Sequence, residues 1–429
     1  MNLATKKKNY ALPIAVMFLL FFMISFVTGL QNPFGVIVKN QFGASNAMSQ
    51  LGNFANFLAY LFMGVPAGLI LQKKGYKFTA LTAVTVGFVG VVMMFLSGVI
   101  ESFGVYLAGA FISGFSLCML NTVVNPMLNI LGGGGNKGNQ LIQFGGSINS
   151  IGATIAPIFV GYLIGGEVSK ASISHANPAL YIAMAIFAFA FIVLKVVEIP
   201  EPRREILSKE NTKPVNNVNS GKKYSALSFR HFVLGAFAIF TYVGAEVGIP
   251  NIINLYMTEN VSLGGLGFAA GVAGTFAGAY WFLMFIGRLT GGVVGGKISS
   301  KTMLTFTSSL GIVLILLAML IPESISFNMF GETVPMKILF LVLCGLCTSI
   351  MWGAIFNLAT EGLGKYTEIA SGIFMMSTIG GGIFPFLQGS LADNFGFLNS
   401  FWLTLVLLAY LLYYALIGSK NVNKDIPIE

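Results

Sequence analysis

The sequence predicts an all-α integral membrane protein in which twelve transmembrane helices form two pseudo-symmetric bundles of six. Three observations predict this class. Of the 429 residues, 55% are hydrophobic and only 9% are charged, whereas soluble domains carry about 25% charged residues. The apolar residues occur in runs of about 20 or more, the length at which a helix crosses a bilayer and too long for the alternating strands of a membrane barrel. The two halves of the chain also repeat a pattern of glycine and proline.

Charged residues, glycines and prolines divide the chain into twelve candidate spans. The first has no Asp, Glu, Lys or Arg between Lys8 and Lys39, and its apolar part is too long for a secretory signal peptide, so we expect it to be retained. A polar segment, 199–229, is expected to link an N-terminal bundle, 1–198, to a C-terminal bundle, 230–429. The expected spans are 11–38, 51–71, 78–98, 103–130, 140–165, 178–198, 231–257, 267–294, 303–321, 336–360, 369–390 and 398–418.

The basic residues predict the orientation, because Lys and Arg are enriched in cytoplasmic loops. With a cytoplasmic N-terminus, all of the 24 Lys and Arg residues except Lys39, Lys170 and Lys337 fall on or near the cytoplasmic side. We therefore expect a multi-pass protein of the inner or plasma membrane with both termini in the cytoplasm. The net charge of +9 then reflects topology and does not indicate a nucleic-acid partner.

An internal repeat relates the two halves. Glycine, proline and glycine occur at Gly152, Pro157 and Gly161 in the fifth span, and the same spacing returns in the eleventh span within 380–389. Parallel repeats related by an axis along the membrane normal are typical of transporters, which bind substrate between the repeats near the midplane.

Several motifs resemble the major facilitator superfamily. GLILQKKGYK at 68–77 is similar to its loop signature, although Gln72 stands where that signature usually has Asp. Within the superfamily, the chain resembles the fucose:proton symporter family, whose members import fucose, glucose, galactose and related sugars. The motifs that carry this resemblance are LQNP at 30–33, LNTVVNPM at 120–127, GGSINSIGATIAP at 145–157, YVGAEVGIP at 242–250 and EGLGKYT at 361–367.

The resemblance implies a symporter that imports a neutral hexose or related sugar by alternating access. It also implies that Asn149, which matches the family's sugar-contacting Asn, binds the sugar. Two departures stand out: Asn32 and Asn121 are amides where the fucose symporter has carboxylates implicated in proton coupling and sugar binding. A proton mechanism that depends on those two positions therefore does not carry over.

Glu246 is the predicted ion-coupling residue. It is the only Asp, Glu, Lys or Arg between Arg230 and Glu259, and an ionisable side chain within the bilayer costs about 2.5–3.5 kcal/mol on insertion scales, which makes it a functional candidate. Just beyond it, Gly248 and Pro250 are expected to weaken or break the helix and free backbone groups. Such a carboxylate can load a proton or, with freed carbonyls, hold Na⁺. The alternative is a structural Glu capped by neighbouring hydroxyls.

Amide side chains and an indole form the predicted sugar site. Asn121 lies within the fourth span, and the repeat places Trp352 at the corresponding position of the tenth. We expect these two to face each other, because an amide bonds sugar hydroxyls while an indole stacks on the apolar face of a pyranose. Hydrogen bonding between helices is the alternative role of such amides. The further sugar candidates are Asn149, Gln143, Asn251 and, at the outer entrance, Asn32.

Arg288 and Glu361 lie near the cytoplasmic ends of the eighth and tenth spans. We expect them to pair as a gate when the carrier faces outward, or else to anchor the interface.

The leading function is a cation-coupled symporter for a neutral sugar. An uncoupled sugar facilitator is an alternative, and Ala156-Pro157, close to a signature of efflux carriers, keeps an antiporter open. We expect neither an enzyme nor a channel, because no catalytic cluster and no ring-forming pattern is visible. The glycines at 132–135 lack the Gly-Lys-Ser/Thr of a phosphate loop. We therefore expect no nucleotide, no metal and no cofactor apart from H⁺ or Na⁺; the expected partners are the sugar and membrane lipid, with a monomer sufficient for transport.

Overall fold

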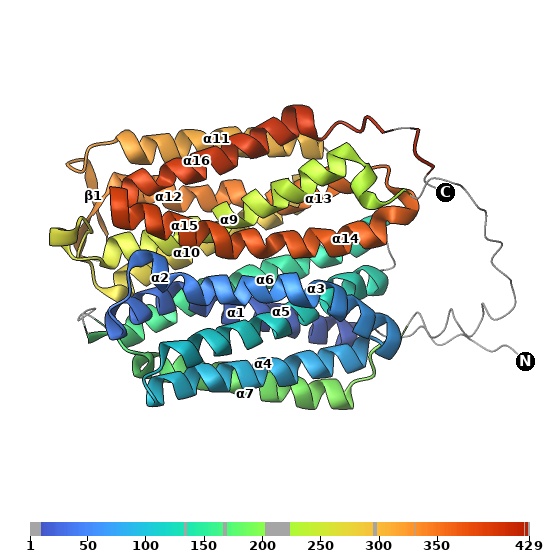
Figure 1. Ribbon diagram of the computed structural model, residues 1–429, viewed down its shortest axis with the longest axis horizontal. Coiled ribbons are helices and arrows are strands. Elements are labelled where there is room, and N and C mark those ends of the chain that lie inside the picture. The colour runs from blue at the N-terminus through green and yellow to red at the C-terminus, as the bar shows by residue number, and fades with distance from the viewer. Residues whose placement is uncertain are drawn as a thin grey trace, which may run out of the picture.

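The computed structural model describes residues 10–132, 135–165, 170–201, 224–294, 298–329, 331–423 and 425–427. Its long helices run roughly along one direction and form two groups that lie side by side (Figure 1). The first group holds α1 (Ala11–Gln41), the short α2 (Asn46–Ser49), α3 (Leu51–Lys74), α4 (Tyr76–Val99), α5 (Phe103–Leu131), α6 (Gly135–Ile164) and α7 (Asn177–Val196).

The second group is the C-terminal half. It holds α9 (Arg230–Thr258), α10 (Ala270–Val294), α11 (Ser300–Leu320), α12 (Met336–Thr348), α13 (Met351–Thr360), α14 (Thr367–Met376), α15 (Gly380–Phe395) and α16 (Phe397–Tyr413). A hairpin of β1 (Ser326–Met329) and β2 (Glu332–Pro335) lies between α11 and α12, with Ser326 opposite Pro335. The two six-helix bundles confirm the predicted fold class. Most of the predicted linker, 202–223, lies outside the described residues.

Eleven described segments are long and apolar enough to cross a membrane. The remaining predicted span, 369–390, is built from α14, a 3₁₀ turn over Ser377–Ile379 and α15 in succession. Directly after this turn, Gly380 packs against the carbonyl of Phe240 on α9, which leaves no space for a side chain. The tenth span is divided in a similar way into α12 and α13.

Close approach at small residues holds each half together. Gly90 of α4 packs against Ser113 of α5, and Gly114 of α5 packs against the backbone of Asn56 on α3. Lipid supplies no hydrophobic drive between helices, so such van der Waals contacts are a main source of packing energy in a bilayer.

Two faces of the bundle are distinguished below. The proximal face is the end at which α1 begins at Ala11, and the distal face is the end at which α1 finishes at Gln41. The two halves meet along α6 and α10, along α3 and α15, and where α1 approaches α9. Among the described residues, α5 has no extensive contact with α12 or α13. The contacts between the halves therefore leave α5 apart from its repeat counterpart.

Candidate functional site

A largely buried ion pair of the C-terminal half is bonded to the N-terminal half near the middle of the bundle. The Oε1 atom of Glu246, on α9, accepts hydrogen bonds from the Tyr242 hydroxyl at 2.7 Å and from Nη2 of Arg288 at 3.3 Å. The Arg288 side chain extends from α10, and its Nη1 donates to the carbonyl of Gly146 and to the Ser150 hydroxyl on α6, both at 3.0 Å. One guanidinium thus links a carboxylate of the C-terminal half to a helix of the N-terminal half.

Glu246 sits on an unbroken helix. The sequence predicted a weakened or broken helix beyond it, but α9 continues from Arg230 to Thr258 with Pro250 inside. Tertiary packing overrides the local signal here, since nearly every residue of α9 from Thr241 onward is buried. The proline still has a local effect: it has no N–H to donate to the carbonyl of Glu246, four residues earlier. The coupling candidate therefore carries both a carboxylate and a backbone carbonyl without its helical partner.

Two of the predicted sugar residues, Asn121 and Asn149, are half-buried and bonded within the N-terminal half. Asn121 Nδ2 donates to the Tyr60 hydroxyl at 3.1 Å and to the carbonyl of Leu117. Asn149 Nδ2 donates to the carbonyl of Phe21 on α1 at 3.1 Å. Among the described residues, none is seen to donate to the side-chain oxygen of either amide, which can accept a hydrogen bond. Gln143 belongs to α6, but its side chain lies outside the described residues.

Trp352 lies beside the ion pair. Its ring centroid is 6.3 Å from that of Tyr242, whose hydroxyl bonds Glu246, and the ring of Phe374 meets the indole edge-on. Tyr242 was not identified from the sequence, although its spacing of four residues from Glu246 would have placed both on one face of α9.

Asn32 and Asn251, predicted as separate sugar contacts, bond each other. Asn32 Nδ2 donates to Asn251 Oδ1 at 3.0 Å, and Asn251 Nδ2 donates to Gln50 Oε1 at 2.9 Å. Asn254 Nδ2 in turn donates to Asn32 Oδ1 at 2.8 Å. We call these four buried residues the amide layer. It connects the two halves on the distal side of Glu246.

The expected pair of Arg288 and Glu361 is not formed in this structure. Glu361 follows the end of α13 and is exposed, and its backbone carbonyl lies 2.9 Å from Nε2 of His231. Arg288 instead points into the bundle, where Glu246 and the α6 backbone take up its donors. A buried guanidinium requires partners for its donors, and only the interior position supplies several at once.

Comparison with known proteins agrees with this architecture. Residues 17–384 match the model of the Major Facilitator Superfamily. A chain of this family is a membrane transporter rather than an enzyme. The chain belongs to the Major Facilitator Superfamily, as its motifs predicted.

Its relatives cover almost the whole chain. The chain is 29% identical to a glucose/galactose transporter of Brucella abortus over 97% of this chain and 96% of the relative. It is 28% identical to a putative glucose/galactose transporter of Helicobacter pylori, over 97% and 99% respectively. It is 24% identical to the L-fucose-proton symporter of Escherichia coli, over 92% and 90%. A crystal structure of the superfamily transporter FucP in the outward conformation has a TM-score of 0.68 at 22% identity, covering 96% of this chain and 100% of that one.

Proposed function

We propose that this chain imports a neutral hexose or related sugar in symport with H⁺ or Na⁺, by alternating access. Relatives named as glucose/galactose transporters and as a fucose-proton symporter support a sugar substrate. The distribution of basic residues supports a distal face outside the cell, with the proximal face and both termini in the cytoplasm. The proposed location is the inner or plasma membrane, and one chain is enough for the transport path.

The observation that carries the coupling proposal is the shared Arg288. A proton or Na⁺ that binds the Glu246 carboxylate competes with the guanidinium for the same oxygen, because all three are cations. Once Glu246 is occupied, Arg288 loses its charge partner in the C-terminal half while Gly146 and Ser150 still bind it in the N-terminal half. Cation binding is thereby linked to the relative position of the two halves.

The proposed sugar site lies beside this pair. Asn149 directly precedes Ser150, which bonds Arg288. A sugar bound at Asn149 would therefore contact the same turn of α6 that holds Arg288. Asn121 supplies a second amide and Trp352 an aromatic face for the pyranose. The remaining proposed sugar contacts are Gln143 and, as sugar arrives from the distal side, Asn32 and Asn251.

An uncoupled facilitator is the second candidate function. The observation that favours it is that Glu246 already has two partners, Tyr242 and Arg288, which is what a purely structural carboxylate requires. An efflux antiporter remains an alternative from the sequence. The pairing of Arg288 with Glu361 in an outward-facing state likewise remains a proposal.

Uptake into proteoliposomes tests the coupling. Radiolabelled glucose, galactose, fucose, fructose and N-acetylglucosamine are offered separately, with a pH gradient or a Na⁺ gradient imposed. We expect one gradient to drive accumulation, up to about tenfold for a tenfold cation gradient with one ion per sugar. Glu246→Gln is expected to bring the sugar only to equal concentrations. Glu323→Gln, a distal carboxylate outside the site, serves as the control and keeps accumulation.

Two outcomes contradict the proposal. Uptake by the unmodified protein that stops at equal concentrations under both gradients means a facilitator with a structural Glu246. Accumulation that survives Glu246→Gln places the coupling elsewhere.

A further inference from the structure

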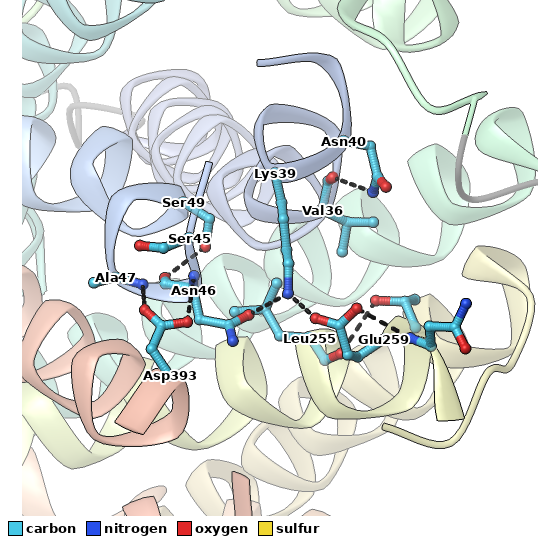
Figure 2. A network of polar contacts seen from close by, with 12 residues as sticks. Val36, Lys39, Asn40, Ser45, Asn46, Ala47, Ser49, Leu255, Glu259 and Asp393 are labelled. Atoms are coloured by element: carbon cyan, nitrogen blue, oxygen red, sulfur yellow. Dashed lines mark hydrogen bonds and ion pairs between the residues drawn. The ribbon is translucent and has the colours of Figure 1, made fainter. Parts of the chain in front are cut away.

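A cluster of charges closes the distal face across the two halves (Figure 2). Lys39, at the end of α1, forms an ion pair with Glu259, which follows α9, and donates from Nζ to Asn46 Oδ1 at 2.7 Å. The ring of Phe397 on α16 lies below the same ammonium, with Nζ 5.9 Å from its centroid. Lys39 therefore holds one contact in its own half and two in the other.

The same residue, Asn46, is held from the opposite side by Asp393 of α15. The two carboxylate oxygens of Asp393 accept the backbone N–H groups of Asn46 and Ala47, each at 2.8 Å (Figure 2). Asp393 is also within electrostatic reach of Lys39. We call Lys39, Asn46, Glu259 and Asp393 the distal clasp. In it, a positive charge of the N-terminal half meets two negative charges of the C-terminal half.

The amide layer lies directly beneath the distal clasp along the same helices. Lys39 and Asn32 are seven residues apart on α1, which is two helical turns, and Glu259 and Asn251 are similarly spaced at the end of α9. Each layer contains bonds that run from one half to the other. Opening the distal face requires all of them to break.

The chemistry of these layers suits an interface that opens. A permanently buried ion pair is often no more stable than apolar residues of the same size, because both charges lose their hydration. Ions and amides have a different property: water replaces their partners when the surfaces separate. The side chains of Lys39 and Glu259 are only 19% and 10% exposed here, so each charge regains hydration when the clasp opens.

We propose that the distal clasp is a gate that holds the distal face closed, and that its release admits ligand to the amide layer. The gate extends the proposed function, since it controls access to the proposed sugar path from the outside. Lys39 is its central member, because its ammonium bonds Asn46 of α2 and also pairs with Glu259 of the C-terminal half. Removing Lys39 or Glu259 leaves the other charge buried without its partner, which favours the open state where that charge meets water.

Spin-label distances in the purified full chain in detergent test the gate without sugar or gradient. Cysteines at Met48 and Leu263, exposed distal residues of opposite halves, carry the labels, since all three native cysteines are buried. We expect Lys39→Ala and Glu259→Gln each to raise the ratio of long to short distances by about tenfold, the change produced by 1.4 kcal/mol. The charge swap Lys39→Glu with Glu259→Lys is expected to restore the short distance.

A matched control lies on the same face within one half. Lys337 Nζ bonds Glu323 Oε1 at 3.0 Å, entirely inside the C-terminal half, so Glu323→Gln is expected to leave the distances unchanged. The gate is rejected if Lys39→Ala matches the unmodified protein, or if Glu323→Gln shifts the distances equally. If Lys39→Ala does not fold, Glu259→Gln and the swap decide the same question.

These results are independent of the cargo. A chain that fails to accumulate any sugar can still show the gate, and a working sugar symporter can still lack it.

Discussion

The two halves meet along two seams that differ in how polar their distal parts are. The distal seam, where α1, α2 and α3 meet α9 and α15, adds ions and amides to the close packing of Gly382 on Phe54 and of Gly389 on the backbone of Asn46. The distal part of the seam between α6 and α10 is formed by glycines: Gly274 packs on the Pro157 carbonyl, Gly161 on the backbone of Ala270, and Gly278 on Ile158. Both seams close the distal part of the molecule, and they differ in the share of ions and amides.

The difference indicates which seam opens. Water replaces the partners of hydrogen bonds and ion pairs at small net cost. The polar groups of such a seam therefore remain hydrogen-bonded after it separates. Close backbone packing between glycines has no such substitute, because water cannot reproduce dispersion contacts that depend on direct approach. We therefore expect the distal seam to open and the α6–α10 seam to remain in contact as the pivot.

The largest effect is expected at the glycine seam. Gly274→Ala places a Cβ against the Pro157 carbonyl, and backbone cannot move aside as a side chain can, so we expect a loss of about 1–3 kcal/mol. Thermal unfolding in detergent measures it. Gly68→Ala is the matched control, because a Cβ there meets nothing within 4 Å. Equal melting temperatures for the two variants would remove the basis for a rigid pivot.

A smaller effect is expected in the amide layer. Asn251→Leu removes the bonds to Asn32 and Gln50, and amide bonds between membrane helices contribute about 0.6–1.7 kcal/mol. The Met48–Leu263 label pair should therefore show a roughly threefold to twentyfold rise in the long-distance ratio. Asn56→Leu is the control, since that buried amide bonds the Ala110 carbonyl within one half. Similar shifts in both variants would argue against a special role for bonds that cross the halves.

The smallest effect is expected for a distal ion pair inside one half. The hydrogen bond from Lys337 holds the pKa of Glu323 below its ordinary value. A lowered carboxyl pKa contributes stability that is full above the unfolded value and is lost as pH falls through the folded value. Because the Glu323 side chain is 62% exposed, we expect Glu323→Gln to cost less than about 0.5 kcal/mol at neutral pH.

Thermal unfolding across acidic pH measures this contribution. The unmodified chain should approach the stability of Glu323→Gln as the carboxylate is protonated. A constant difference at all pH values would show that the pair does not stabilise the fold through its charge.

Some features of this protein follow from local sequence, and others depend on how the helices pack. The number of spans and the two-bundle fold follow from hydropathy, because lipid requires every spanning segment to satisfy its own backbone as a helix. Glu246 stood out for a similar reason, as a single charge in a long apolar run. Such signals depend only on neighbouring residues and on the surrounding solvent.

Pairing does not follow from local signals. We expected Arg288 and Glu361 to pair because both lie near the cytoplasmic ends of their spans. Arg288 instead bonds Glu246 and α6, because the direction and reach of a side chain decide its partners. Asn32 and Asn251 were identified separately as sugar contacts, and only the approach of α1 to α9 shows that they bond each other.

The sequence by itself therefore determined the class of protein, its spans and its interior charge, because the cost of polar groups in lipid acts residue by residue. The tertiary structure alone decided that Lys39 meets Glu259 and that Asp393 holds Asn46. Those contacts join residues far apart in the chain, and their energy depends on a geometry that exists only after both halves have packed together.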